Sequence, residues 1–457
     1  MSTDLNRAAQ RRSALWRIHC WAALLASPFA LAAALTGLLY VFTPQIEHHL
    51  YAHLDQVRPQ AQMQPLDEAL KAARTAVPAD WTLHSFSPAP EPSASHQFAL
   101  VPPMKPPQAM QKPAQAEHGQ HQAPTADKKA EFLKPIFGFP KNAVVVYINP
   151  YSLEVLGQLS TQERFTNWSR KLHSNWLQNN AWRWLIEFAA SWMMVLLVSG
   201  MALAWPFKGL LPQARTTGRP AWKQWHVLLG VTLALMSLAI TTTGLTWSQN
   251  AGQQVRVLRD ATGQASPQIP ASIHSDPTQG LPLLSWQQAW EAIQKSAPPI
   301  RMQILPPKSP HDAWRAAHME RTPPTDRFDL LLDAYTGEPL FYSGWGDQSL
   351  FGQATAVGIP FHRGELGWWN QALLLVFGLG VVFSLVSGWV MVFKRRRLGM
   401  PVLPELQHGA WASLPWGSWL VAASLLWLMP LLAISAAAVA MLEMAWWWRS
   451  RASLSTT

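Results

Sequence analysis

Five long apolar segments constrain this chain more than any other feature of its sequence. They lie near residues 21–42, 181–205, 225–247, 368–393 and 416–444. A helix needs about 20 apolar residues to cross a bilayer, and Trp and Tyr gather at the segment ends, where amphipathic rings prefer the membrane interface. The sequence therefore predicts a polytopic α-helical membrane protein with about five transmembrane helices.

Basic residues predict the orientation of these helices. They precede the first helix, fill the connection 206–224 and end the fourth helix at Lys394–Arg397. Because Lys and Arg stay on the cytoplasmic side, we expect a cytoplasmic N-terminus and a retained first helix, whose apolar stretch is too long for a cleaved signal peptide. Five spans would place the C-terminus outside, whereas Arg449 and Arg451 favour the inside and Pro430 allows a broken fifth helix. The side of the C-terminus therefore stays open.

The expected order along the chain alternates helices with external domains and short cytoplasmic loops. It runs as a cytoplasmic N-terminus with the first helix (1–42), a first external domain (43–180), a second helix (181–205), a loop (206–224), a third helix (225–247), a second external domain (248–367), a fourth helix (368–393), a loop (394–415), a fifth helix (416–444) and a tail (445–457). The net charge of +10 comes largely from the anchoring residues and from the external loops, so it does not predict nucleic-acid binding. Cys20, the single cysteine, allows no intrachain disulfide and is expected to be inert.

The pattern of helix, external domain and helix occurs twice, over 1–205 and 222–396. In both external domains an amphipathic helix start is followed by a strand and a polar turn. The helix starts are 65–70 and 284–290, the strands are 80–83, 143–148 and 327–333, and the turns are 149–151 and 334–338. We expect two small α+β domains.

A Pro-, Gln-, Ala-, His- and Met-rich stretch interrupts the first domain at about 89–135. It has no hydrophobic periodicity, which predicts a disordered, solvated insertion. Its soft and borderline ligands could instead bind a metal, although their spacing matches no defined site. These ligands are His96, Met104, Met110, His118 and His121.

Four histidines occupy equivalent places beside the first four helices. His19 and His226 open the odd helices at the cytoplasmic edge, whereas His173 and His362 precede the even helices at the outer edge. A Ser/Thr-Gly pair follows each histidine, 18 positions away to the Gly on both odd helices and 27 and 26 positions away on the even ones. The four glycines are Gly37, Gly200, Gly244 and Gly388.

Paired imidazoles on neighbouring helices can supply both axial ligands of a haem. We therefore expect two non-covalent, bis-histidine haem b groups, one near each face, since the chain has no Cys-x-x-Cys-His motif. The glycines could admit the porphyrin, or they could simply allow close helix packing. The histidines could equally be interfacial residues that bind backbone. Glu187 could bond a ligand histidine or relay a proton, although an interfacial carboxylate explains it as well. His48, His49 and His53 could line a substrate surface or lie in solvent.

Over nearly its whole length the chain resembles the PepSY-associated transmembrane family of iron-regulated bacterial inner-membrane proteins, which includes ferric-siderophore reductases. The resemblance rests on the order and duplication of short motifs. They are Trp16 to Trp21 with Thr36-Gly37, Leu172-His173 with Trp182 to Leu185, Trp225 to Gly230, Gly358 to Gly364 with Gly367 and Asn370-Gln371, and the turns at Asn149 to Tyr151 and Asp333 to Glu338.

This resemblance implies PepSY-like external domains and an oxidoreductase that passes electrons to a ferric siderophore in the periplasm. It implies that the haem iron ligands are His19, His173, His226 and His362. No flavin domain is fused to the chain, so electrons would come from a separate donor, either a cytoplasmic reductase or a quinol. The other partner would be membrane lipid.

Two other functions compete with this hypothesis. The external domains could bind a peptide or inhibit a protease, with the helices as mere anchors, but this leaves the four equivalent histidines unexplained. A transporter is a third alternative, although the helices lack central charges and paired Gly/Pro breaks.

Overall fold

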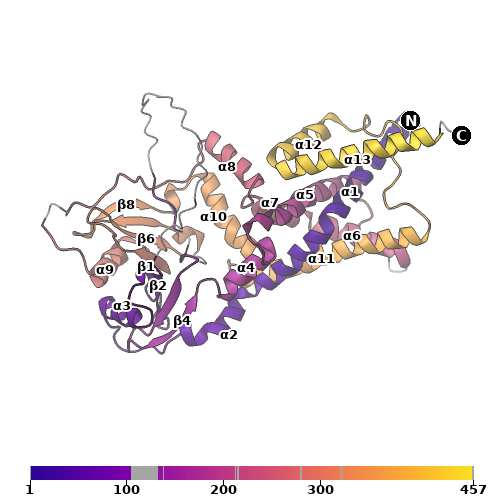
Figure 1. The fold of residues 1–457 in the computed structure, drawn as a ribbon. Coiled ribbons are helices and arrows are strands. Elements are labelled where there is room, and N and C mark those ends of the chain that lie inside the picture. The colour runs from indigo at the N-terminus through magenta and orange to yellow at the C-terminus, as the bar shows by residue number, and fades with distance from the viewer. Residues whose placement is uncertain are drawn as a thin grey trace, which may run out of the picture. The chain divides into compact units, whose positions relative to one another are not determined.

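The computed structural model describes residues 2–103, 132–136, 138–211, 213, 216–277, 280–319, 321 and 323–454. The chain forms two compact units (Figure 1). The helical unit comprises Met1–Thr43, Trp168–Gln264 and Thr355–Thr457, and the sheet unit comprises Pro44–Asn167 and Ala265–Ala354.

Long apolar helices form the helical unit. Within the described residues, four helices are long and apolar enough to cross a membrane, or five if a bent pair counts as one span. α1 (Ser2–Val41) packs along α5 (Trp184–Ala204) and α11 (Trp368–Arg397), and α11 packs along α6 (Gly218–Thr232). The prediction of a polytopic helical membrane protein is confirmed at this level.

Two of the predicted helices are broken. The third is α6 followed by α7 (Ala234–Leu245), bent by 59° at Leu233. Leu233 lies against α11 at Gly380, where a Cβ would come within 2.3 Å of Leu233 Cδ1. The fifth is two helices, α12 (Trp416–Leu428) and α13 (Pro430–Leu454). Proline disfavours the helical conformation of the residue before it, and Met429 has φ −126° and ψ 84°.

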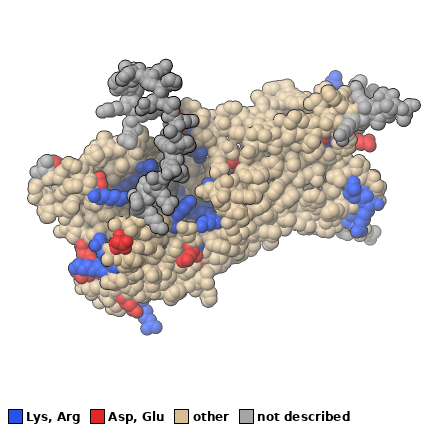
Figure 2. Space-filling model, in the orientation of Figure 1, with Lys and Arg blue, Asp and Glu red and all other residues tan. Residues whose placement is uncertain are grey.

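The C-terminal helix α13 is tied to the N-terminal half of α1. The Arg17 guanidinium donates to the Glu443 carboxylate at 2.8 and 2.9 Å, and the Trp21 indole N–H donates to the same carboxylate. This contact places both termini at one end of the helical unit (Figure 1). Lys394–Arg397 end α11, and Figure 2 shows Lys and Arg gathered at one end of this unit. We call the end with these residues the basic end.

The sheet unit contains one antiparallel sheet of eight strands in the order β4-β3-β2-β1-β5-β6-β7-β8 (Figure 1). The strands are β1 (Thr82–Ser87), β2 (His96–Val101), β3 (Val144–Ile148), β4 (Val155–Ser160), β5 (Met302–Leu305), β6 (Trp314–His318), β7 (Asp329–Leu332) and β8 (Pro339–Ser343). The two expected domains share this sheet, because β1 pairs with β5 through Phe86 and Ile304 and joins the halves. Each half is a four-stranded sheet, and the pairing of β1 with β5 covers one otherwise unpaired edge strand of each half.

Two helices from the two repeats cover one face of the sheet. α3 (Leu66–Thr75) and α9 (Trp286–Ser296) bury a common core that includes Phe86, Phe98 and Phe328. Each helix also caps the other. The Asp67 carboxylate accepts the N–H groups of Trp286 and Gln287 at 3.1 and 3.2 Å, and Gln287 Oε1 accepts the N–H of Leu66 at 3.1 Å. These contacts satisfy N–H groups that the helix starts leave free.

A second, smaller core lies where α2 (Thr43–Asp55) contributes Leu54 against β2 and β3. Arg164 lies beside it and donates to Asp55 at 2.5 Å and to the Tyr147 hydroxyl at 2.6 Å. The charge of this partly buried guanidinium is therefore balanced within the sheet unit.

The predicted insertion is shorter than expected at its start. Residues 96–101 form β2, which pairs with β1 on one side and β3 on the other and buries Phe98 and Leu100 completely. Burial of these apolar side chains stabilises the strand, although the low-complexity sequence around it gives no indication of a strand. Met104, Met110, His118 and His121 lie outside the described residues.

The unit boundaries also differ from the expected external domains. Residues 168–180, 248–264 and 355–367 belong to the helical unit. They include most of α4 (Phe165–Asn175) and α10 (Leu350–Arg363), together with α8 (Ala251–Ala261). The described residues also form the short helices η1 (Asn180–Arg183), η3 (Pro324–Asp326) and η4 (Trp345–Asp347).

Candidate functional site: two pairs of histidines

In the first repeat, each histidine is bonded to a hydroxyl on the partner helix. His19 on α1 has its Nδ1 3.1 Å from the Ser199 hydroxyl on α5. His173 on α4 has its Nδ1 3.0 Å from the Thr36 hydroxyl on α1. The Ser/Thr of each Ser/Thr-Gly pair therefore holds the histidine of the neighbouring helix.

The second repeat has the same arrangement. His226 on α6 has its Nδ1 3.0 Å from the Ser387 hydroxyl and 3.0 Å from the carbonyl of Ser384 on α11. His362 on α10 has its Nδ1 3.0 Å from the Thr243 hydroxyl on α7. The repeat seen in the sequence is thus a repeat of contacts.

The hydroxyl protons are already used within the helices. Thr36 Oγ1 donates to the carbonyl of Ala32 at 2.8 Å, and Ser199 Oγ donates to that of Val195 at 2.7 Å. Ser387 in the second repeat donates to a carbonyl of its own helix in the same way, at 2.9 Å. Each hydroxyl can then only accept from the imidazole, so Nδ1 carries the ring proton and Nε2 keeps its lone pair. The arrangement selects the tautomer that can bind a metal through Nε2.

The four glycines lie against the imidazoles. A Cβ added at each glycine would meet the Cε1 atom of a histidine on another helix. The separations are 3.1 Å from Gly200 to His19, 3.4 Å from Gly37 to His173, 3.3 Å from Gly244 to His362 and 3.8 Å from Gly388 to His226. The glycines therefore make room for the ring edges.

The histidines pair across the two repeats at each level of the helical unit. The ring centres of His19 and His226 are 6.4 Å apart, with the ring planes at 82°. At the other level, burial and the neighbouring His362 lower the pKa of His173 to about 4. His173 is therefore neutral at physiological pH, as a metal ligand must be. We call His19 with His226 the basic-end pair, and His173 with His362 the opposite pair.

The spacing of the basic-end pair fits a metal ion between the rings. A metal lies about 2 Å from an imidazole nitrogen, and the ring centre lies about 1 Å behind that nitrogen, so two axial ligands place their ring centres about 6 Å apart. No group of three or more His, Cys, Asp or Glu side chains suited to a metal occurs among the described residues. A cofactor that brings its own in-plane ligands and needs two axial imidazoles, as haem does, suits this donor set.

The two pairs lie at different depths of the helical unit. His19 and the glycine that contacts His173 are 18 residues apart on the single helix α1. At 1.5 Å per residue this separation is about 27 Å. This is close to the hydrocarbon thickness of a bilayer, about 30 Å.

Glu187 makes its hydrogen bonds at the start of α8. Its buried carboxylate accepts the backbone N–H groups of Asn250 and Ala251 at 3.1 and 2.7 Å, and none of its hydrogen bonds within the described residues is to a histidine. Because free N–H groups and the helix dipole favour an anion at a helix start, Glu187 stabilises the N-terminus of α8. Neither Arg17–Glu443 nor this cap had a signal in the sequence that would identify its partner.

Other histidines do not join the pairs. His96 is completely buried on β2, where its Nδ1 accepts the N–H of Ala89 at 2.9 Å. It is a core residue of the sheet, so the hypothesis of a metal site in the insertion loses one ligand. His48 lies on α2, where its Nδ1 is 3.1 Å from Gln56 Nε2.

Comparison with known proteins identifies the family. The family profile described as PepSY-associated TM region matches residues 16–395, more than four-fifths of the chain. No curated protein matches the chain at a significant level. The chain therefore belongs to the PepSY-associated TM region family, as its sequence motifs predicted.

Proposed function

We propose that this member of the PepSY-associated TM region family is a haem-containing oxidoreductase of the bacterial inner membrane that passes electrons outward to a ferric siderophore. The observation that carries the proposal is the geometry of the basic-end pair, in which His19 and His226 lie 6.4 Å apart by ring centres with both Nδ1 atoms bonded to serine hydroxyls. Structural burial of two histidines would require neither this distance between the rings nor a serine hydroxyl at each Nδ1.

His19 and His226 would hold one haem b, and His173 and His362 would hold a second. Bound there, haem would supply a one-electron Fe(III)/Fe(II) couple, as electron transfer requires. The serine and threonine hydroxyls orient the imidazoles and strengthen them as ligands by accepting the Nδ1 proton.

The basic end would face the cytoplasm by the positive-inside rule. The opposite pair would then lie near the periplasmic surface, where a siderophore complex is available. Reduction of Fe(III) to Fe(II) weakens its complex with hard oxygen ligands and releases the iron without destroying the siderophore. No acid, base or nucleophile of the protein is needed for that step, because only an electron is transferred.

An optical spectrum of the detergent-purified full-length protein, before and after dithionite, tests the proposal. We expect sharp, reduced low-spin b-type bands and a pyridine haemochrome value of two haems per chain. Reoxidation by added ferric siderophore, followed at the same bands, would test the substrate. A colourless protein from haem-sufficient cells would overturn the proposal and favour a membrane-anchored module that binds peptides or regulates a protease.

A further inference from the structure

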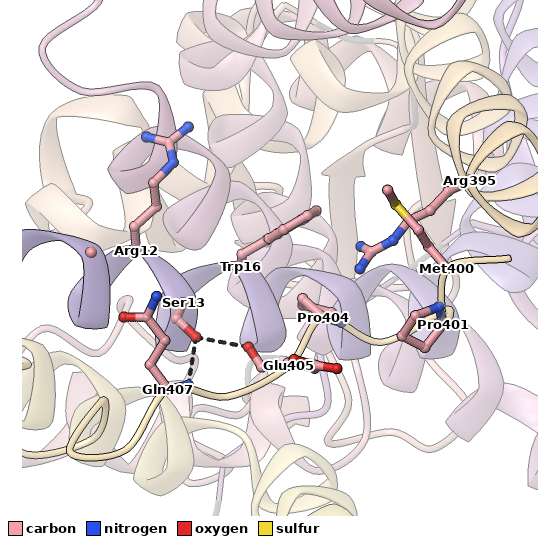
Figure 3. Close-up of a pocket in the computed structure, with 10 residues that line it drawn as sticks. Arg12, Ser13, Trp16, Arg395, Met400, Pro401, Pro404, Glu405 and Gln407 are labelled. Carbon is pink, nitrogen blue, oxygen red and sulfur yellow. Dashed lines mark hydrogen bonds between the residues drawn. The ribbon is translucent and has the colours of Figure 1, made fainter. Parts of the chain in front are cut away.

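A cavity of about 480 Å³ lies at the basic end of the helical unit, between the start of α1, the end of α11 and the loop that follows α11 (Figure 3). Its walls combine charged, aromatic and polar side chains. They include Arg12, Trp16, Arg395, Met400, Glu405 and Gln407.

This cavity is one helical turn from the basic-end pair. Trp16 lines it and precedes His19 by three residues on α1. Three residues span about 4.5 Å along a helix axis. A molecule in the cavity would therefore lie next to the helix turn that carries His19.

The polar groups of the cavity are incompletely satisfied. The Arg395 guanidinium lies 4.6 Å from the centre of the Trp16 ring, and its buried Nε has no hydrogen-bond partner among the described residues. Glu405 accepts from the Ser13 hydroxyl only through its main-chain carbonyl, at 2.9 Å (Figure 3). No hydrogen bond or ion pair joins its carboxylate to another described residue. One donor and one proton acceptor thus remain available beside an aromatic face.

We infer that this cavity binds a quinol, the lipid-soluble donor whose oxidation supplies the electrons. This inference rests on the proposed function, which requires a donor at the basic end. The quinol ring would contact Trp16, the Arg395 guanidinium would donate to a ring oxygen, and the Glu405 carboxylate would accept a proton. A phosphate-bearing ligand suits the cavity less well, because the unpaired Glu405 would repel it.

The reaction balances with reactants already named. The quinol loses two electrons and two protons and becomes the quinone. The electrons reduce two ferric siderophore complexes to the ferrous state, one electron each. The protons pass to Glu405 and from there to water at the basic end, so the carboxylate is regenerated for the next proton.

Photolabelling tests the site independently of haem. The full-length protein, with and without haem, is irradiated with a short-chain azidoquinone, and the labelled peptides are identified by mass spectrometry. We expect label within residues 9–16 and 395–407, and excess unlabelled short-chain quinone should abolish it. Label found only elsewhere would overturn the inference. Protection by phosphatidylglycerol vesicles but not by quinone would also overturn it and would identify a lipid headgroup site.

Kinetics of haem reduction test the roles of the side chains. Anaerobic addition of a short-chain ubiquinol or menaquinol should reduce the haem of the wild-type protein. Glu405→Gln should slow this by roughly 100-fold, since general-base catalysis contributes about that much, and Arg395→Gln should slow it as well. Dithionite, which needs no such site, should reduce both variants at the wild-type rate.

Arg396→Gln is the matched control, because Arg396 is exposed, adjacent to Arg395 and absent from the cavity wall. It should leave the quinol rate unchanged. If dithionite reduces the haem but neither quinol does, the donor site is wrong while the proposed function stands. If the protein contains no haem, the proposed function itself fails, and the photolabelling result still decides whether a quinone binds here.

Discussion

The two repeats build the same site from helices of different shape. In the first repeat α1 runs from Ser2 to Val41 without a break, although Pro28 lies inside it. In the second repeat the corresponding segment is broken at Leu233 and bends by 59°, although it contains no proline there. Proline content therefore does not decide which of the two helices bends.

Packing explains the difference better. Leu233 lies directly over Gly380 of α11, which leaves no room for a side chain at that position. Because Gly380 has no side chain, Leu233 can pack directly against the backbone of α11. Small residues commonly allow such close approaches between membrane helices. Despite the bend, both repeats keep 18 residues between histidine and glycine and the same hydroxyl-to-Nδ1 bond. The comparison indicates that the histidine contacts, rather than the helix path, are what the two repeats share.

Removing one ligand is the strongest way to break the equivalence of the repeats. His19→Ala or His226→Ala should remove the haem of the basic-end pair and leave the other, because each haem needs one imidazole from each repeat. His173→Ala or His362→Ala should do the reverse. Pyridine haemochrome assays should give one haem per chain in all four variants, and redox titration should identify the one that remains.

The control for these variants is His274→Ala, which changes an exposed histidine of the sheet unit. It should retain two haems. Loss of both haems from any single ligand variant, with a normally folded protein by gel filtration, would contradict the pairing across repeats.

Much of the helical site could be predicted from the sequence, because it follows from spacing. The histidines and the Ser/Thr-Gly pairs recur at fixed intervals, and an interval along a helix is a distance. Which histidine meets which glycine could not be predicted, since this depends on how α4 and α10 pack on the helices. The sequence shows the hydroxyls only as neighbours of the glycines, and nothing in it indicates their bond to Nδ1.

The local elements of the sheet could be predicted from the sequence, whereas the joining of its two halves could not. The helix starts at 65–70 and 284–290 and the strand at 143–148 have strong local patterns, and α3, α9 and β3 confirm them. The ladder between β1 and β5 has a single residue pair, between residues 218 positions apart, and no local sequence pattern predicts it. The two halves are joined by their edge strands, β1 and β5. Hydrophobic periodicity along a strand does not indicate which edge strands pair.

After removal of a ligand, removal of a hydroxyl that bonds a ligand histidine should have the next largest effect on haem binding. Thr36→Val keeps the shape of the side chain but removes the acceptor of the His173 Nδ1 proton. Loss of such an outer-shell partner typically lowers metal affinity by about 10- to 100-fold. We expect faster loss of haem from the opposite pair, measured by transfer to an excess of apomyoglobin. Thr36→Ser keeps the hydroxyl and should behave as the wild-type protein, so equal loss from both variants would contradict the role assigned to the hydroxyl.

Acid should distinguish the two halves of the sheet. His96 opens β2 and pairs with Ile148, as Trp314 opens β6 and pairs with Leu332. Burial lowers the pKa of His96 to about 4, below the value of about 6.5 expected in the unfolded chain. The unfolded chain therefore binds a proton that folded His96 does not, so stability is complete above about pH 6.5 and is lost as the pH falls toward 4.

This linkage predicts a loss of about 2 kcal/mol in the free energy of opening of β2 between pH 7 and pH 5. Hydrogen exchange of the full-length protein, corrected for the intrinsic pH dependence, measures it in peptides from β2 and β6. His318 on β6 is only partly buried and should give a smaller change of the same sign, since burial also lowers its pKa. His96→Gln should remove most of the dependence in β2. An unchanged dependence in that variant would show that another group titrates.

The finest test of the equivalence of the repeats uses the two glycines at the basic-end pair. A Cβ at Gly200 would lie 3.1 Å from His19 Cε1, closer than carbon atoms normally approach, whereas one at Gly388 would lie 3.8 Å from His226 Cε1, which is ordinary contact. Gly200→Ala should therefore displace the imidazole and cost about 1 kcal/mol through overpacking, or about fivefold in haem affinity, while Gly388→Ala should leave the affinity unchanged. Haem transfer to apomyoglobin, measured for both variants at one temperature, gives the ratio directly. Equal rates would mean that the imidazoles adjust freely in both repeats and that the glycines matter for helix packing alone.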